Sequence, residues 1–143
     1  MSPVLGPRER LQHAAALPAV LEASYGAFEQ MLVAIRVHED PASGLFGAFV
    51  MTAASAADGR DAVAFAPSLP PRPGTQAPGD GDGEPAEEDD EAVAESVAAL
   101  SRLLAVRLAQ AGASAPDPGD RAACADAARC AEDIYGLLHR SGP

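Results

Sequence analysis

The 143-residue sequence predicts an all-α protein, a small four-helix bundle made of two helical hairpins that a disordered linker joins. Two alanine-rich blocks carry large apolar residues at helical spacing, and a Pro/Gly-rich stretch that becomes strongly acidic separates them. We expect an N-terminal helical half at 1–66, a flexible linker at 67–86 and a C-terminal helical hairpin at 87–143. The residues outside the linker suffice for only one domain, so both halves should share one core.

The first expected helices lie before residue 40. Pro7 opens a short helix, which Leu17-Pro18 interrupts because the residue before a proline is pushed away from helical angles. From Pro18 onward, large apolar residues recur at steps of four and three, which is the spacing of one helix face. These residues are Leu21, Tyr25, Phe28, Leu32 and Ile35. The pattern predicts a helix over 18–38.

Asp40-Pro41 and Asp58-Gly59 bracket the next helix, which we expect over 41–57, with 60–66 as one helical turn or irregular. An acidic residue followed by proline is typical of a helix N-terminus, and a glycine is typical of the end. The alternative is an α+β protein in which about 46–66 form a β-hairpin, with FGAFVM and DAVAFA as strands. The alanine-rich connection and the matched cap signals favour the helix.

The C-terminal block contains two further helices, expected over 87–111 and 118–139. The first begins in a run of acidic residues, which offset the positive end of the helix dipole, and ends at Gly112. The second has Asp117 as its cap and Pro118 at its first position. The apolar stripes are Val93, Val97, Leu100, Leu104 and Leu108 in the first helix, and Ala123, Ala127, Cys130, Ile134 and Leu137 in the second. Their short connection predicts an antiparallel hairpin.

The charge is concentrated around the linker. The chain has a formal net charge of −11, and 67–91 alone contain eight acidic residues and one arginine. Neither helical block has the basic surface that phosphate contacts require, so we expect no nucleic acid partner. The uncharged run 41–57 is too short and too weakly apolar for a bilayer-spanning helix, and the first residues lack the apolar segment of a signal peptide. We therefore expect no membrane association and a cytoplasmic location.

Acidic residues of the linker match part of a calcium-binding loop. The EF-hand positions 1, 3, 5, 9 and 12 fall on Asp80, Asp82, Glu84, Glu88 and Glu91. The sixth position of such a loop requires glycine for a sharp turn, and here it is Pro85. The loop also needs a preceding helix, whereas Pro and Gly residues precede this run. The sequence therefore favours a solvated charged linker over a calcium site.

The cysteine and histidine spacing does not favour a zinc site. Cys124 and Cys130 are six residues apart on one helix and so point about 120° away from each other, whereas ligands on one helix are three or four residues apart. His139 faces a direction similar to that of Cys130 but lies several turns away. Cys130 fits the apolar stripe as a small core residue. We expect no catalytic, cofactor-binding or metal-binding residue, and no cofactor.

A protein–protein interaction function is the one that the sequence favours. The core is thin and alanine-rich, and marginal cores of this kind often gain stability from a partner. Small residues such as Gly44, Gly47 and Ala48 allow close helix–helix contact, within the chain or with a partner. We therefore expect a non-enzymatic regulatory or accessory subunit, with another protein or a second copy as partner.

The alternative is a small-ligand-binding or enzymatic domain. It would use Tyr25, His38 and the polar cluster at Asp58, Arg60 and Asp61. If 41–57 are helical, the rise per residue places the two polar clusters roughly 25 Å apart, so that they cannot share one active site. In the hairpin interpretation they could come nearer. Capping and solvation of helix ends is the simpler explanation of both clusters.

Overall fold

The structure, a computed structural model, describes residues 7–38, 40–70 and 89–141. Over these residues it contains helices and no strand. The helices are α1 (Pro7–His13), α2 (Leu17–Val37), α3 (Phe46–Ala64), α4 (Asp90–Ser114) and α5 (Pro118–Ser141). The prediction of an all-α bundle is confirmed. The alternative β-hairpin at about 46–66 is wrong, because α3 runs through most of that stretch without a break.

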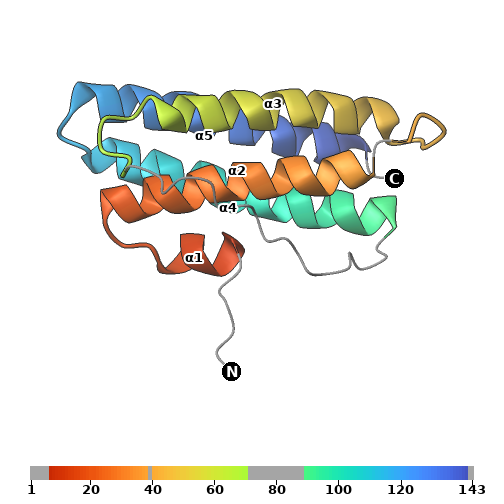
Figure 1. Ribbon diagram of the computed structural model, residues 1–143, viewed down its shortest axis with the longest axis horizontal. Coiled ribbons are helices and arrows are strands. Elements are labelled where there is room, and N and C mark those ends of the chain that lie inside the picture. The colour runs from red at the N-terminus through yellow and green to blue at the C-terminus, as the bar shows by residue number, and fades with distance from the viewer. Residues whose placement is uncertain (1–6, 39, 71–88, 142–143) are drawn as a thin grey trace.

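Four long helices form the bundle, and each is antiparallel to both of its neighbours (Figure 1). α2 packs against α3 and α4, and α5 packs against the same two helices from the opposite corner. In Figure 1, α3 and α5 form the upper layer, and α2 and α4 form the lower one. α1 lies outside this square, in contact with α2 and α4. α3 and α4 are therefore diagonal helices that point in the same direction.

The described ends of the connection from α3 to α4 lie at opposite ends of the bundle. At one end, Ser68 donates hydrogen bonds from its backbone N (2.9 Å) and its Oγ (2.6 Å) to the carboxylate of Asp120, in the first turn of α5. At the other end Asp90 begins α4, whose 25 residues span about 37 Å. Leu69 packs against the core. The rest of the predicted linker, 71–86, lies outside the described residues.

Two glycines that the sequence suggested as helix ends lie inside helices. α3 continues five residues beyond Gly59, and α4 continues two beyond Gly112. A Cβ at Gly59 would lie 2.5 Å from atoms of the Phe28 ring, and one at Gly112 would lie 2.9 Å from the Cβ of Cys124. Both glycines therefore serve close contact between helices, and the predicted ends at these positions are wrong.

The predicted starts of two helices also shift. Asp40 Oδ1 accepts a hydrogen bond from the backbone N of Ala42 (3.0 Å), and this bond stabilises a turn instead of capping a helix. α3 begins later, at Phe46. Asp89 is the N-cap of α4, because its Oδ1 accepts a hydrogen bond from the N of Ala92 (2.9 Å). The expected cap of α5 is confirmed, since Gly119 N donates to Asp117 Oδ1 (2.7 Å).

The core consists of alanines and a few large side chains. The largest that are fully buried are Leu11, Leu21, Phe28, Met31, Ile35, Phe49, Leu104, Leu108 and Ile134. On α5 the predicted stripe is partly wrong, because Cys130 and Leu137 are only half-buried whereas Cys124 and Leu138 are buried. The reason is that α5 packs against both α3 and α4, so its buried face is wider than one stripe.

Candidate interaction surface

The first half of α3 presents an uncharged face to solvent. Gly47, Val50, Met51 and Ala54 are exposed, and their spacing of three, one and three residues places them on one side of the helix. Val50 is 42 % exposed and Met51 is 56 % exposed. No charged residue occurs anywhere from 41 to 57. We call these four residues the α3 outer face.

A helix on the surface of a globular protein usually has a polar outer side. α5 follows this rule, since Asp126, Arg129, Glu132 and Asp133 are exposed on it. α3 does not follow it over its first half, where the side away from the core is as apolar as the side toward it. An apolar helix side is normally buried, so the α3 outer face has the composition of a surface that something covers.

Gly47 has no close packing contact among the residues that the structure describes. A Cβ at this position would meet no atom within 4 Å, in contrast to Gly59 and Gly112. Glycine in a helix is less favourable than alanine by up to about 1 kcal/mol. No contact with another described residue requires Gly47, and the absence of a side chain leaves open space on the α3 outer face beside Met51.

Other exposed apolar side chains lie at the same end of the molecule. Val33 and Val37 are exposed and lie one turn apart near the end of α2, which leads into the start of α3. Together with Val50 and Met51, they make four of the six large hydrophobic residues that are exposed among the described residues. Most of the exposed large apolar side chains among the described residues therefore lie at the end of the bundle where α2 meets α3.

Hydrogen bonds to Asp90 fix the same end of the bundle. His38 Nδ1, at the C-cap of α2, lies 2.9 Å from Asp90 Oδ1. Ser43 Oγ donates to Asp90 Oδ2 (2.5 Å) and accepts a hydrogen bond from the backbone N of Leu45 (3.0 Å). The His38 ring also makes an edge contact with Phe49. These contacts attach the turn between α2 and α3 to the first residue of α4.

The bond from Ser43 and the bond from His38 lower the pKa of the Asp90 carboxyl below its ordinary value. Both stabilise the ionised carboxylate, and they outweigh the opposing effect of partial burial. The carboxylate accepts from both side chains, so the histidine does not lie between the acid and the hydroxyl. This order differs from that of a catalytic triad, in which the histidine is the central group. The cluster therefore acts as a clamp between helices.

The structure does not join the two polar clusters of the alternative function. Asp58 and Asp61 are exposed on α3, and Arg60 pairs with Asp61 at 3.5 Å. His38 contacts Phe49, and Asp58 lies nine residues farther along the same helix, or about 13 Å along its axis. Among the described contacts, His38 pairs with Asp90 and none joins it to the cluster on α3.

The two cysteines are free thiols in different surroundings. Cys124 is buried, and burial together with the charge of Asp120 raises the pKa of its thiol. Cys130 is half-buried, and the pKa of its thiol is raised by burial and then by the nearby charge of Asp58. A raised pKa leaves little of the reactive thiolate at neutral pH. Neither position has the electropositive surroundings of a nucleophilic cysteine.

Metal ligands do not gather in the part of the chain that the structure describes. No group of three or more His, Cys, Asp or Glu side chains there is arranged to hold an ion. The calcium-loop match is not tested, because Asp80 to Glu88 lie outside the described residues and only Glu91 lies within them. None of the described helices has the length and apolar character needed to cross a bilayer.

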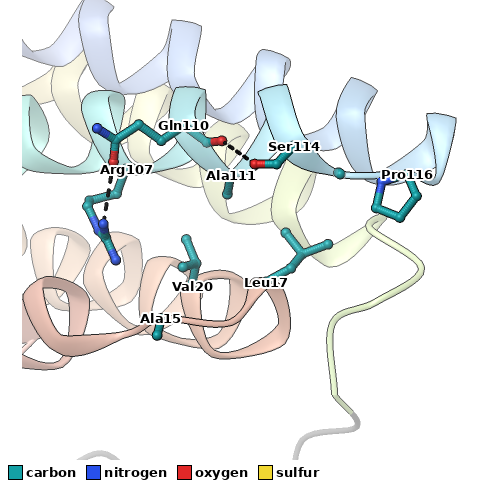
Figure 2. A pocket seen from close by; sticks show the side chains of 9 residues that line it. Ala15, Leu17, Val20, Arg107, Gln110, Ala111, Ser114 and Pro116 are labelled. Atoms are coloured by element: carbon teal, nitrogen blue, oxygen red, sulfur yellow. Dashed lines mark hydrogen bonds between the residues drawn. The ribbon is translucent and has the colours of Figure 1, made fainter.

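A shallow pocket of about 350 Å³ lies between α2 and the last turns of α4. Figure 2 shows Arg107 and Gln110 of α4 on one side of it and Val20 on the other. Arg107 donates from Nε to the carbonyl O of Leu11 (3.2 Å) and from a terminal nitrogen to the carbonyl O of Ala14. The guanidinium thus holds the end of α1 against α4, and these bonds account for the arginine without a ligand.

Comparison with protein-family models, with curated proteins and with solved structures gave no match for the chain. A function for the chain is therefore inferred from the geometry of the described residues alone. The candidate residues for a ligand or enzyme site were polar, whereas the surface that stands out is apolar. The signals for it were the uncharged run 41–57 and its small residues Gly44, Gly47 and Ala48, which allow close contact within the chain or with a partner.

Proposed function

We propose that the protein is a non-enzymatic interaction module, a regulatory or accessory subunit, that binds a protein partner through the α3 outer face. The observation that carries this proposal is the uncharged, exposed side of α3 around Val50 and Met51. Exposed apolar side chains that lie together on one surface are typical of contact sites on soluble proteins. Methionine is common in such contacts because its flexible side chain adapts to different partner surfaces.

The fixed position of α3 supports the proposal. The core side of the helix carries Phe49, which is fully buried, and the turn before it is held through Ser43 to Asp90. An interaction surface on a rigid element loses less conformational entropy on binding than one on a mobile loop. We also propose a cytoplasmic location.

Affinity capture from the organism that encodes the chain tests the proposal. The bait is the full chain, compared with Met51→Glu and with Val106→Glu as the matched control. Val106 is 47 % exposed and lies on α4, away from the α3 outer face. We expect the wild-type chain and Val106→Glu to retain the same protein and Met51→Glu to lose it. If all three baits retain the same proteins, the α3 outer face is not the contact surface.

A further inference from the structure

We propose that the pocket between α2 and the last turns of α4 binds a small organic monocarboxylate with a short apolar chain, whose carboxylate pairs with Arg107. This site is separate from the α3 outer face and does not depend on the proposed function. Three observations carry the inference. They are the charge of Arg107, the hydrogen-bond donors that its side chain keeps, and the composition of the pocket around it.

The positive charge of Arg107 is not matched by the groups that it contacts. Its half-buried guanidinium donates to the carbonyl oxygens of Leu11 and Ala14 and to the amide oxygen of Gln110. These three acceptors are neutral. Burial of a charge is unfavourable unless an opposite charge compensates it. The bonds to the carbonyl groups therefore hold the guanidinium in place without a ligand, but they leave its charge for an anion to match.

Arg107 also keeps donors for such an anion. An arginine side chain has five N–H groups, of which two lie on each terminal nitrogen. At Arg107, Nε and one terminal nitrogen each donate once to a carbonyl oxygen, and the other terminal nitrogen donates to Gln110 Oε1 (3.4 Å). Each terminal nitrogen thus keeps one N–H that has no acceptor in its described contacts. A carboxylate can accept from both terminal nitrogens at once, because their spacing suits its two oxygens.

The rest of the pocket is mostly apolar. In Figure 2 the Arg107 side chain points from α4 toward α2, where Leu17 and Val20 form the opposite wall with Ala111 of α4 beside them. The chain has 21 aspartates and glutamates, yet none is among the described residues that line this pocket. A ligand here would therefore meet one cation and an aliphatic wall. A negative group joined to an apolar chain is complementary to both.

The single charge favours a carboxylate over a phosphate. A phosphate group carries about two negative charges near neutral pH and has three strong acceptor oxygens. Of the nine described residues that line the pocket, Arg107 is the charged one, and it offers two N–H groups. A carboxylate matches this site with one charge and two oxygens. Because the pocket is shallow, the ligand stays partly in solvent, so we expect a dissociation constant on the order of 1 mM.

Titration of the full chain with hexanoate, followed by ¹H–¹⁵N NMR, tests the inference. We expect the backbone signals of Val20, Ala111 and Ser114 to shift and to saturate between about 0.1 and about 20 mM. Hexanamide has the same chain without the charge, and inorganic phosphate has charge without the chain. At matched ionic strength, each should bind at least about tenfold more weakly. Shifts that do not saturate, or equal affinity for either control compound, would overturn the proposed site.

Two variants locate the site. Arg107→Gln removes the charge and should abolish the saturable shifts, but it also removes bonds that hold α1. Ala111→Leu is therefore the second test, because it fills the pocket and keeps Arg107, and it should weaken hexanoate binding at least about tenfold. Ala109→Leu is the matched control, since Ala109 is exposed on the same helix and does not line the pocket. Hexanoate binding that survives both Arg107→Gln and Ala111→Leu would refute the site.

Discussion

The ring of Phe28 lies directly against the backbone of Gly59, where an added Cβ would be 2.5 Å from two ring atoms. Phe28 is fully buried on α2, and Gly59 is buried on α3. The contact sets how closely the two helices of the first hairpin approach.

We expect Gly59→Ala to destabilise the protein by about 1–3 kcal/mol, because the methyl group must push a buried ring aside in a packed core. Gly47→Ala is the matched control in the same helix. It should leave stability unchanged or raise it by up to about 1 kcal/mol, since its Cβ enters open space. Urea unfolding followed by circular dichroism measures both. Equal effects at the two positions would mean that the Phe28 contact does not limit the helix approach.

The hydrogen bonds to Asp90 should make the stability of the protein depend on pH in the acid range. Its pKa is lowered in the folded protein, chiefly by the bond from Ser43 and then by the bond from His38. A carboxyl of this kind contributes stability above its unfolded pKa of about 3.9, and the contribution is lost as the pH falls through the folded value. The difference in melting temperature between the wild type and Asp90→Asn should therefore be largest at neutral pH.

Melting curves of both proteins between pH 7 and the acid limit of solubility check this expectation. The two should converge as the pH drops below the ordinary range of an aspartate. Asp126→Asn is the control, because Asp126 is exposed and pairs with Arg129 on its own helix. A difference for Asp90→Asn that stays constant across the acid range would contradict the assigned role of the Ser43 and His38 bonds.

Replacing Thr52 with valine should stabilise the folded protein. Its hydroxyl is fully buried in α3 and has no hydrogen-bond partner among the described residues. A buried hydroxyl without a partner is unfavourable by about 1–3 kcal/mol, and valine has nearly the same shape. We expect Thr52→Val to raise the free energy of unfolding by about 1 kcal/mol. Ser101→Ala should not stabilise, because Ser101 Oγ donates to the carbonyl of Ala98 (2.8 Å). Stabilisation by both changes would point to helix propensity instead.

The connection between α3 and α4 should have a minimum length. Its fixed ends, Ser68 at Asp120 and Asp89 at the start of α4, lie about 37 Å apart along the bundle. Each residue spans at most about 3.5 Å. Removing about six residues from 71–88 should leave the melting temperature nearly unchanged, whereas removing about fourteen should prevent the four helices from packing together. Circular dichroism and size-exclusion chromatography distinguish the two outcomes. Normal packing after the longer deletion would contradict the diagonal arrangement of α3 and α4.

Periodicity was sufficient to predict the helices, because a helix face is a local property. The 4-3-4-3 spacing from Leu21 to Ile35 identified α2, and Phe28 and Ile35 are indeed fully buried. The ends of the helices were harder to predict from the sequence. Glycine is a common residue at helix ends, so Gly59 and Gly112 were read as ends. Both are glycine because a side chain of a neighbouring helix lies against them, and a local sequence pattern holds no information about that neighbour.

The candidate surface and its clamp were harder to predict. His38 and Asp90 are 52 residues apart in sequence, and only the packing of α2 on α4 brings them together. The sequence indicated Gly47 for a close contact, but it did not show that Val50 and Met51 lie beside it on the exposed side of α3, because alanine, glycine and serine fit equally well in a core and on a surface. The absence of charge from 41 to 57 was visible, but which residues face outward was not.

The diagonal placement of α3 and α4 has a consequence for how the chain folds. Each hairpin, α2 with α3 and α4 with α5, is made of neighbouring segments that meet after a short loop, and local contacts form quickly. The contacts of α2 with α4 and of α3 with α5 require the ends of a long connection to meet, which is slower. We therefore expect docking of preformed hairpins to limit the rate, with the alanine-rich sides of all four helices exposed until that step. During synthesis, α2 would lack its contacts with α4, and α3 would lack its contacts with α5, until those helices had left the ribosome.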